Sequence, residues 1–476
     1  MKKEIIKEII MDFHINDLPA VIQRDIELPI NSNKIITLIG VRRSGKTYIL
    51  FDTIKKLIAD VSINPLNPIF TSHLTLPSPL AGEGNSSGRK GKKEEMGELQ
   101  IRYKIPKENI LYINFEDERL ELKKDDMDLI LQSYRELYPD IKLSECFFFF
   151  DEIQNIDGWD KFIRRVYENI TKNIFITGSN SKLLSKEIAT SLRGRTIAYE
   201  VFPLSFKEYL TFNNVVPDIY HSKTKAKIVN LFEKFLFEGG FPELVNITDK
   251  TIKHKILQEY FNVMLYRDLI ERYGFSNIAV VKFFMKRVLS NIASPVSINK
   301  IYNELKSQNY KIGKNLLYEI FQAMEDIYFA LILKKANPSI LKQEFSEKKV
   351  YSIDNGLLNV LNFKISKDYG KLLENLIFLE LYKKNRNIYF YKNNKECDFV
   401  IIDELKGNQA IQVCYSMTGP ETKKREVSGL LEVCNRFKLK EGYIITFSNE
   451  ESFVENDVSV NIIPAYKFSL NFTGKL

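Results

Sequence analysis

A glycine-rich segment near the amino end carries side chains that could bind a phosphate chain. It fits the pattern G-x-x-x-x-G-K-[ST], in which glycines let successive backbone N–H groups face phosphate oxygens. We expect Lys46 to reach the β- and γ-phosphates of ATP, and the hydroxyl of Thr47 to bind Mg²⁺. The residues predicted to contact the nucleotide are Gly40, Val41, Arg42, Arg43, Ser44, Gly45, Lys46, Thr47 and Tyr48.

Two consecutive carboxylates, Asp151 and Glu152, follow an apolar run of residues 147–150. Such a run indicates a buried strand of a parallel sheet, and parallel sheets bind ligands at the carboxyl ends of their strands. There Asp151 would bind Mg²⁺, and Glu152 would orient and deprotonate the attacking water. Acidic residues also favour the first turn of a helix. The phosphate-binding pattern makes the catalytic interpretation the stronger of the two.

Further polar candidates follow the strand-like run at residues 173–177. Ser179 or Asn180 could sense the γ-phosphate and hold the water, and Asn180 is our catalytic candidate; capping of the next helix is the alternative. Beyond that helix, Arg193 or Arg195 could stabilise transition-state charge in the site of a neighbouring subunit. We take Arg195 as the candidate, while an ordinary surface arginine remains the other interpretation.

These side chains need a scaffold, and residues 34–177 have the pattern of one. Strand-like runs at 35–39, 110–115, 146–150 and 173–177 alternate with helical patterns, and a helix is expected at 48–58. This alternation predicts a parallel sheet in a three-layer α/β sandwich, the fold class of P-loop NTPases. Residues 71–97, with their Gly, Pro, Ser and Lys, predict a disordered insertion. A basic loop that binds nucleic acid is the alternative there.

The remaining chain is expected to be helical and then mixed α/β. We predict an ATPase domain at 1–201, a helical lid or linker at 202–276, a winged-helix-like unit at 277–345 and a last domain at 346–476. Lys311, Lys314 and Asn315 would begin the recognition helix of the winged-helix-like unit, which could contact DNA or a protein. In the last domain we expect a helix at 371–384 and strands near 388–391, 397–402, 410–415 and 442–446.

The composition is that of an ordinary globular protein. A length of 476 residues favours several domains. The sequence has no long uncharged apolar stretch, so we predict no membrane span. The charged amino end is unlike a signal peptide, so we expect a cytoplasmic protein. Four cysteines without CxxC spacing argue against a zinc or disulfide framework. The net charge of +8 permits contact with nucleic acid but does not require it.

Several short motifs together resemble a group of prokaryotic AAA-type ATPases with a C-terminal domain of unknown function. The motifs are the phosphate-binding pattern and residues 112–117, 150–155, 158–159, 177–182, 239–242, 266–268 and 374–375. The resemblance covers nearly the whole chain outside residues 71–97. It implies an AAA-type core, a helical middle with a winged-helix-like unit, and a terminal fold similar to restriction endonucleases.

The terminal domain lacks part of the set that such a nuclease needs. PD-(D/E)xK endonucleases use carboxylates from a helix and two strands, with a lysine, to bind Mg²⁺ and stabilise the nucleophile. Glu374, Glu396 and Asp398 could supply carboxylates, but Gln412 and Cys414 stand where Glu and Lys would be needed. We therefore predict a domain that does not cut.

The sequence thus predicts an ATPase, using ATP and Mg²⁺, whose nucleotide state controls how its C-terminal regions bind a partner. DNA is the first candidate partner and a protein client the second, and an oligomer is left open. Two alternatives remain: an ATP-regulated, Mg²⁺-dependent DNA nuclease, and a nucleotide-gated binding switch with negligible turnover.

Overall fold

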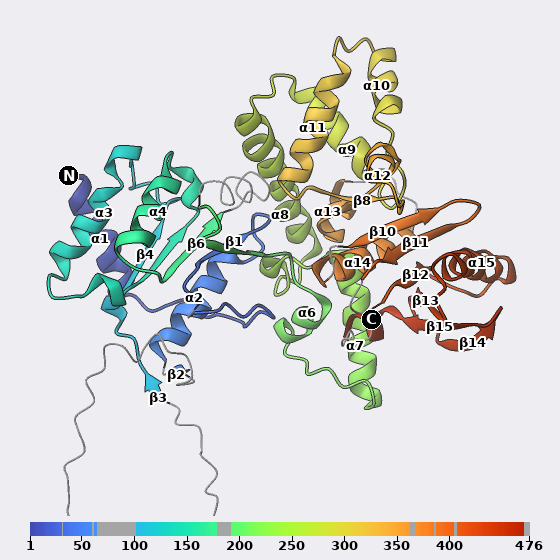
Figure 1. The fold of residues 1–476 in the computed structure, drawn as a ribbon, viewed down its shortest axis with the longest axis horizontal. Coiled ribbons are helices and arrows are strands. Elements are labelled where there is room, and N and C mark those ends of the chain that lie inside the picture. The colour runs from blue at the N-terminus through green and yellow to red at the C-terminus, as the bar shows by residue number, and fades with distance from the viewer. Residues whose placement is uncertain are drawn as a thin grey trace, which may run out of the picture.

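The computed structural model describes residues 1–30, 32–59, 61–63, 101–178, 192–361, 368–384, 387–403 and 407–470. The predicted insertion at 71–97 and the candidate Asn180 lie outside these residues. Figure 1 shows an amino-terminal α/β unit on one side, a C-terminal unit on the other, and helices between them.

The amino-terminal unit is built on a five-stranded sheet in the order β4-β5-β6-β1-β7. All of its neighbouring strands pair in parallel. The strands are β1 (Ile35–Ile39), β4 (Ile110–Asn114), β5 (Phe147–Asp151), β6 (Ile174–Gly178) and β7 (Thr196–Glu200). A separate antiparallel pair joins β2 (Val61–Ile63) to β3 (Ile101–Tyr103).

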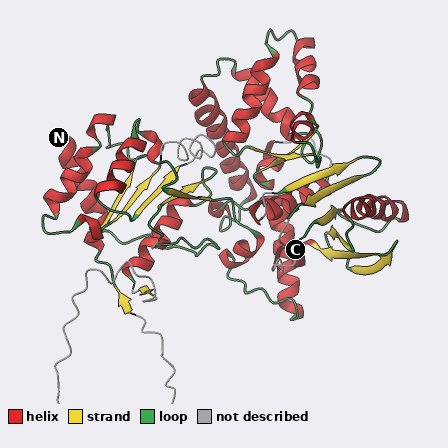
Figure 2. Ribbon diagram, in the orientation of Figure 1, coloured by secondary structure: helices red, strands yellow, loops and turns green. Residues whose placement is uncertain are grey.

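The phenylalanines of β5 explain why helices cover both faces of this sheet. Phe148 and Phe150 pack with helices α1 (Lys2–Ile15), α3 (Asp128–Leu137) and α4 (Trp159–Asn169). Phe147 and Phe149 pack with α2 (Lys46–Ile58) on the opposite face. Alternate side chains of a strand point to opposite faces, so an all-apolar strand requires two covers. Figure 2 shows helices on either side of the strands, and the predicted three-layer α/β sandwich is confirmed.

The middle of the chain is helical, as predicted. Helix α7 ends at Glu238, immediately before Gly239 and Gly240. The helices are α6 (Phe206–Phe212), α7 (Ser222–Glu238), α8 (Lys250–Val263), the π-helix η6 (Met264–Glu271), α9 (Ile278–Leu289), α10 (Ile298–Ser307) and α11 (Lys314–Asp326). After α11, strands β8 (Ala330–Lys334) and β9 (Lys348–Ser352) pair antiparallel, with α12 (Ile340–Phe345) between them and α13 (Asn355–Leu361) after them.

The C-terminal unit has a six-stranded mixed sheet in the order β10-β11-β12-β13-β15-β14. Its elements are α14 (Tyr369–Lys384), β10 (Ile388–Lys392), β11 (Glu396–Ile401), β12 (Gln409–Val413), α15 (Pro420–Phe437), β13 (Glu441–Thr446), β14 (Glu451–Glu455), β15 (Val458–Pro464) and α16 (Ala465–Leu470). The predicted helix and four strands lie within two residues of their expected bounds. Strands β14 and β15 were not predicted.

One apolar core joins the helical middle to the C-terminal sheet. It includes Phe232 of α7, Phe284 of α9, Phe378 of α14 and Phe399 of β11. Because this core is continuous, the two regions support each other's packing. Within the described ranges, no helix has the length and apolarity that crossing a membrane requires.

Candidate active site

The segment at residues 40–47 connects β1 to α2, so the predicted strand–loop–helix setting is present. Two glycines are needed for its course. Gly40 has φ +149°, and a Cβ there would lie 2.1 Å from the carbonyl oxygen of Val201. Gly45 has φ +95° and precedes the first turn of α2, which begins at Lys46, two residues before the predicted start. The amino end of a helix, with its free N–H groups, favours an anion.

The Lys46 side chain is buried and folds back over this loop. Its Nζ donates to the carbonyl oxygens of Gly40, at 3.1 Å, and Val41, at 3.2 Å. The same nitrogen lies 3.6 Å from Oε1 of Glu152. The predicted phosphate-binding cation and the predicted base are therefore neighbours, although they lie 106 positions apart in the sequence.

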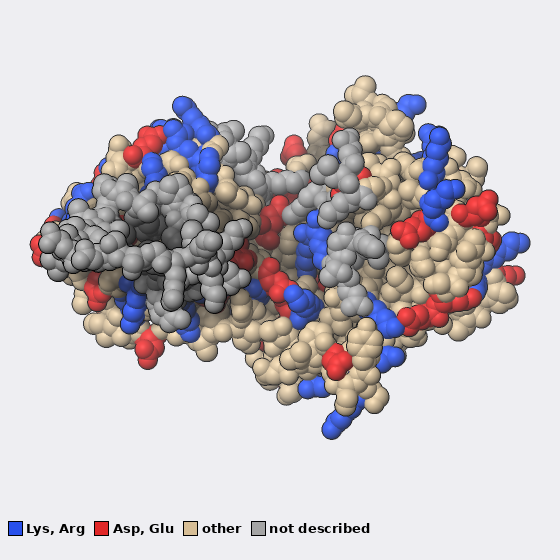
Figure 3. Space-filling model, turned by 60° about the horizontal axis from the view of Figure 1, so that its bottom comes forward, with Lys and Arg blue, Asp and Glu red and all other residues tan. Residues whose placement is uncertain are grey.

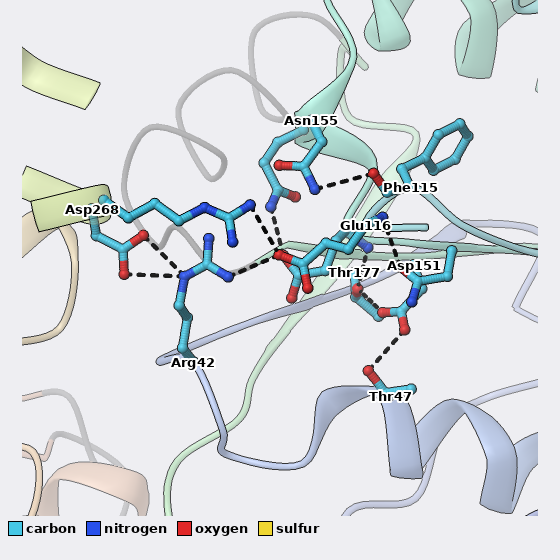
Figure 4. Close-up of polar contacts among 12 residues, drawn as sticks. Arg42, Thr47, Phe115, Glu116, Asp151, Asn155, Thr177 and Asp268 are labelled. Atoms are coloured by element: carbon cyan, nitrogen blue, oxygen red, sulfur yellow. Dashed lines mark hydrogen bonds and ion pairs between the residues drawn. The ribbon is translucent and has the colours of Figure 1, made fainter. Parts of the chain in front are cut away.

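Asp151 lies at the carboxyl end of β5 and accepts hydrogen bonds from three hydroxyl groups. Thr47 Oγ1 donates to Oδ2 at 2.7 Å and Tyr112 OH to the same oxygen at 3.1 Å. Thr177 Oγ1 donates to Oδ1. Figure 4 shows Asp151 between Thr47 and Thr177. Sequence reasoning missed Tyr112, in the middle of β4, and Thr177, near the carboxyl end of β6, although both strands lie beside β5.

The surroundings of Asp151 fit Mg²⁺. The carboxylate is 1% exposed, and burial raises the pKa of Asp151 above its ordinary value. Its hydrogen-bond partners among the described residues are uncharged, so no side chain there neutralises it. A hard divalent cation prefers oxygen ligands, and Thr47 and Asp151 present two of them side by side.

Glu152 is held in a backbone conformation that few residues other than glycine adopt. Its φ is +52°, and its N–H donates to Thr177 Oγ1 at 2.8 Å. Its carboxylate accepts a hydrogen bond from Gln154 Nε2 as well as facing Lys46. Strained backbone of this kind persists where the surroundings fix it, and it is common at active sites. Here it directs the carboxylate towards the loop.

Arg42 makes the longest-range connection of the loop. Its Nε donates to Asp268 Oδ1 at 3.0 Å, and its Nη1 donates to Glu116 Oε1 at 2.9 Å. Arg267 Nη2 also lies 3.3 Å from Glu116 Oε1. Figure 4 shows Arg42 between the two carboxylates. Burial raises the pKa of Asp268, and the positive charge of Arg42 opposes that rise. The predicted contact of Arg42 with nucleotide stays a prediction.

The other loop side chains differ in exposure. Val41 and Ser44 are buried, whereas Tyr48 is 52% exposed. Arg43 is also exposed; its Nη1 lies 3.5 Å from Glu243 Oε2, and its guanidinium is 5.8 Å from the centre of the Tyr260 ring. Their predicted nucleotide contacts are likewise untested.

A buried arginine that sequence reasoning missed, Arg24, supports the loop through a hydrogen bond to its backbone. Arg24 Nη1 donates to the Ser44 carbonyl at 2.7 Å, and its Nη2 donates to that of Phe202 at 2.9 Å. Its Nε donates to Glu208 Oε1 at 2.6 Å. No local pattern in the sequence marks Arg24, because its partners lie 20 to 184 positions away.

Arg195 lies at the opposite edge of the sheet from the loop. It immediately precedes β7, and its Nη2 lies 2.8 Å from Glu168 Oε1. Strand β7 runs parallel to β1, so the five residues of β7 separate Arg195 from the loop edge by about 16 Å. Arg193, with φ +45°, is in the turn before it. Neither arginine reaches the site of its own chain, and a role in a neighbouring subunit stays a prediction.

Three segments of the chain match known domain families. Residues 91–210 match an AAA domain, residues 229–368 a domain of unknown function (DUF8612), and residues 369–468 a second domain of unknown function (DUF4143). The AAA match includes β4, β5 and β6, and hence Asp151 and Glu152. The Lys46 loop lies before the matched segment.

Similar proteins are known from an archaeon and a bacterium. The uncharacterized protein MJ1544 of Methanocaldococcus jannaschii is 37% identical over 486 residues, which span 99% of this chain and 96% of the relative. An uncharacterized protein of Haemophilus influenzae is 30% identical over 337 residues, spanning 70% of this chain and 80% of that protein.

Solved structures give weaker likenesses. The Walker-type ATPase paby2304 of Pyrococcus abyssi has a TM-score of 0.37 at 15% identity, covering 72% of this chain and 99% of that one. The AAA+ hexamer of McrB with bound McrC from Thermococcus gammatolerans has a TM-score of 0.19 at 14% identity, covering 41% and 52%. Scores this low define no shared fold, so the α/β assignment rests on the sheet and on the AAA match.

Proposed function

We propose that this chain, which belongs to the same protein family as MJ1544 of Methanocaldococcus jannaschii, binds ATP with Mg²⁺ and hydrolyses it. The observation that carries this proposal is the meeting of two residue pairs at one edge of the sheet. Thr47 lies 2.7 Å from Asp151, and Lys46 lies 3.6 Å from Glu152. One pair suits a metal, and the other suits phosphate and water.

Each side chain has a distinct part in the reaction. Lys46 and the amino end of α2 neutralise the phosphate chain. Thr47 and Asp151 would hold Mg²⁺, which would supply positive charge beside the phosphates. Glu152 orients the attacking water and takes its proton. Gln154, which donates to Glu152, fixes the direction of that carboxylate. Asn180 as a γ-phosphate sensor and Arg195 as an arginine finger in an oligomer complete the proposal.

The ion pairs of Arg42 support a coupling between nucleotide and the rest of the chain. Asp268 belongs to η6, and π-helices are often found at functional positions. A phosphate chain in the loop competes for the Arg42 guanidinium. Weakening of its pair with Asp268 would then release η6. Arg42 thus gives the nucleotide state a direct route to the helical middle.

The partner of this coupled region is proposed to be DNA, with a protein client as the second candidate. Residues 277–345 would form the winged-helix-like unit within the domain division given above. Lys311, just before α11, and Asn315, in its first turn, are exposed, and Lys314 Nζ lies 5.6 Å from the ring centre of the exposed Tyr318. Cations beside an exposed aromatic ring suit nucleic acid. On the face in Figure 3, Lys and Arg are interspersed with Asp and Glu rather than gathered in one patch.

ATP turnover with and without nucleic acid tests the choice of partner. We expect double-stranded DNA to raise the rate of phosphate release, and single-stranded DNA and RNA serve as comparisons. The variant Lys314→Ala with Lys311→Ala should lose the stimulation while keeping the basal rate. Equal rates under all conditions would reject DNA and favour a protein client.

The nuclease alternative is tested separately. Supercoiled DNA incubated with the protein, ATP and Mg²⁺ should stay intact, because the set of residues for cleavage is incomplete. Nicking that disappears in an Asp398→Ala variant would establish the nuclease instead.

A further inference from the structure

A buried lysine, Lys349, lies at the centre of a cluster of three acidic residues, Glu374, Glu396 and Asp398. Lys349, on β9, is 1% exposed. Its Nζ lies 2.8 Å from Glu396 Oε1, 3.1 Å from Asp398 Oδ1 and 3.2 Å from Glu374 Oε1. An ammonium group has three N–H donors and no acceptor, so one donor is available for each carboxylate.

Two of the three carboxylates, those of Glu374 and Asp398, are also fixed from the other side. Tyr351 OH donates to Glu374 Oε1 at 2.7 Å, and the Val413 N–H donates to Asp398 Oδ2 at 3.0 Å. Strand β9, helix α14 and strand β11 thereby meet at one point. Three carboxylates thus surround the ammonium group of Lys349, and we call this arrangement the shell.

Gln412, which stands where a nuclease would carry a carboxylate, takes no part in this shell. Its Oε1 accepts from the Asp398 N–H at 3.1 Å, and its Nε2 donates to Glu426 Oε2 at 2.6 Å. Both polar atoms of the Gln412 side chain therefore form hydrogen bonds with groups other than Lys349. The shell has three carboxylates and is complete around Lys349 without Gln412.

We propose that the Lys349 ammonium is the resident cation of this cluster and takes the position that a divalent metal ion would otherwise occupy. Divalent Mg²⁺ or Mn²⁺ needs carboxylate oxygens at about 2.0–2.2 Å, so it and the ammonium cannot share these three carboxylates at the observed distances. With Lys349 in place, neither these three carboxylates nor any other group of three or more His, Cys, Asp or Glu side chains among the described residues is arranged to hold a metal ion.

The charge balance favours a lysine that stays protonated. Burial by itself lowers the pKa of Lys349, but the surrounding acidic groups, with Tyr351 and Asp398 foremost, outweigh it and raise that pKa. Burial, and next the charge of Asp398, raise the pKa of Glu374. The Lys349 ammonium, at 2.8 to 3.2 Å from three acidic side chains, is thus the positive charge at the centre of the cluster, while Lys392 Nζ pairs with Glu396 from its outer side at 3.8 Å.

Binding of Mn²⁺ to the full chain without nucleotide tests this proposal. All proteins carry Asp151→Asn, so that the loop site does not contribute. Thermal unfolding is measured with Mn²⁺ and with EDTA, and bound Mn²⁺ is counted by electron paramagnetic resonance. The parent protein of this experiment is the Asp151→Asn chain with Lys349 intact. We expect Mn²⁺ to have no effect on its thermal unfolding. Lys349→Met should unfold several degrees lower in EDTA, and should regain stability with one bound Mn²⁺.

The controls separate this site from general effects. Lys348→Met changes the neighbouring lysine on β9, which is partly exposed and pairs with Glu344 at 3.6 Å, and should show no Mn²⁺ effect. Adding Asp398→Asn to Lys349→Met should abolish the Mn²⁺ effect. If Lys349→Met does not fold in EDTA, refolding with Mn²⁺ is compared, and recovery of folded protein is expected.

Two results would overturn the proposal. Mn²⁺ bound to the parent protein and lost with Asp398→Asn would mean that the ammonium does not exclude a metal ion. Failure of Mn²⁺ to stabilise or refold Lys349→Met would mean that the carboxylates do not form a cation site at all. Neither result depends on whether the chain hydrolyses ATP.

Discussion

The guanidinium of Arg42 forms an ion pair with the carboxylate of Asp268, 226 positions later in the chain, with Nε 3.0 Å from Oδ1. Both side chains are largely buried, which limits screening by solvent. The pair ties the loop between β1 and α2 to the π-helix η6. A change in the loop therefore has a direct physical connection to the helical middle.

Asp268→Asn should break this connection. Among the described residues, the substitution leaves Arg42 with the more exposed Glu116 as its one ion-pair partner. Loss of one partner of a buried pair costs about 3 kcal/mol. In the parent protein, a non-hydrolysable ATP analogue should change hydrogen exchange of residues 264–271, and the variant should lose that change. Glu116→Gln, the matched control, should keep it. A variant that responds like the parent would contradict the coupling.

Gly40→Ala should destabilise the ATPase unit strongly. The new Cβ would lie 2.1 Å from the Val201 carbonyl oxygen, which is backbone and cannot move aside cheaply. We expect a loss of about 3 kcal/mol. Gly194→Ala is the control, because Gly194 also has positive φ but a Cβ there would meet no other part of the described chain within 4 Å. It should lose about 1 kcal/mol.

The single tryptophan, Trp159 of α4, makes this comparison local to the ATPase unit. Its fluorescence during urea unfolding follows that unit alone. Equal unfolding midpoints for Gly40→Ala and Gly194→Ala would show that the close approach to Val201 is unimportant.

Arg24→Met should destabilise the same unit by about 3–5 kcal/mol, since it leaves buried Glu208 without its cation. It should also weaken ATP binding, because the Ser44 carbonyl in the loop loses its donor. Arg24→Lys restores the charge but not the several donors of a guanidinium, so a partial rescue is expected. Trp159 fluorescence and nucleotide titration measure the two effects. Unchanged ATP affinity in Arg24→Met would remove Arg24 from the support of the loop.

Asp354 should give the chain a stability that falls with rising pH. It is 2% exposed and accepts hydrogen bonds from the N–H groups of Gly240 and Gly356. Burial raises the pKa of Asp354 from 3.8 to about 6. Between these values the folded state binds more protons than the unfolded state, so this contribution declines as pH rises from about 4 to about 6 and is level above that.

Comparison with Asp354→Asn isolates the effect. The stability of the parent relative to the variant should fall by roughly 3 kcal/mol across that window, because a shift of one pKa unit corresponds to about 1.4 kcal/mol. Urea unfolding followed by circular dichroism at several pH values measures it. A difference that is constant with pH would contradict the raised pKa.

The sequence predicted the parts of the site that local pattern determines. The loop needs its glycines, Lys46 and Thr47 in adjacent positions, and the run at 147–150 could only be a doubly covered strand. Parallel strands bring their carboxyl ends together, so the contact between Thr47 and Asp151 followed from the fold class.

The missed features depend on position in three dimensions. Strand β7 lies at the edge of its sheet with its residues partly exposed, so it lacks the apolar run that identified the other strands. The partners of Arg42 and Arg24, and the place of Lys349 among three carboxylates, come from segments 20 or more residues apart. A single sequence gives no periodicity that links such segments. The alternation Val458, Val460 and Ile462 of β15, by contrast, is a strand signal that local reasoning could have used.

Release of phosphate from ATP in the presence of Mg²⁺ tests the central claim most directly. The parent protein should turn over ATP. Lys46→Ala should lose both turnover and most nucleotide affinity, because the phosphates lose their cation. Glu152→Gln should still bind ATP but lose at least about a hundredfold in rate, since it cannot take a proton from water. Full activity in Lys46→Ala, or a parent rate no higher than that of Glu152→Gln, would contradict ATP hydrolysis at this site.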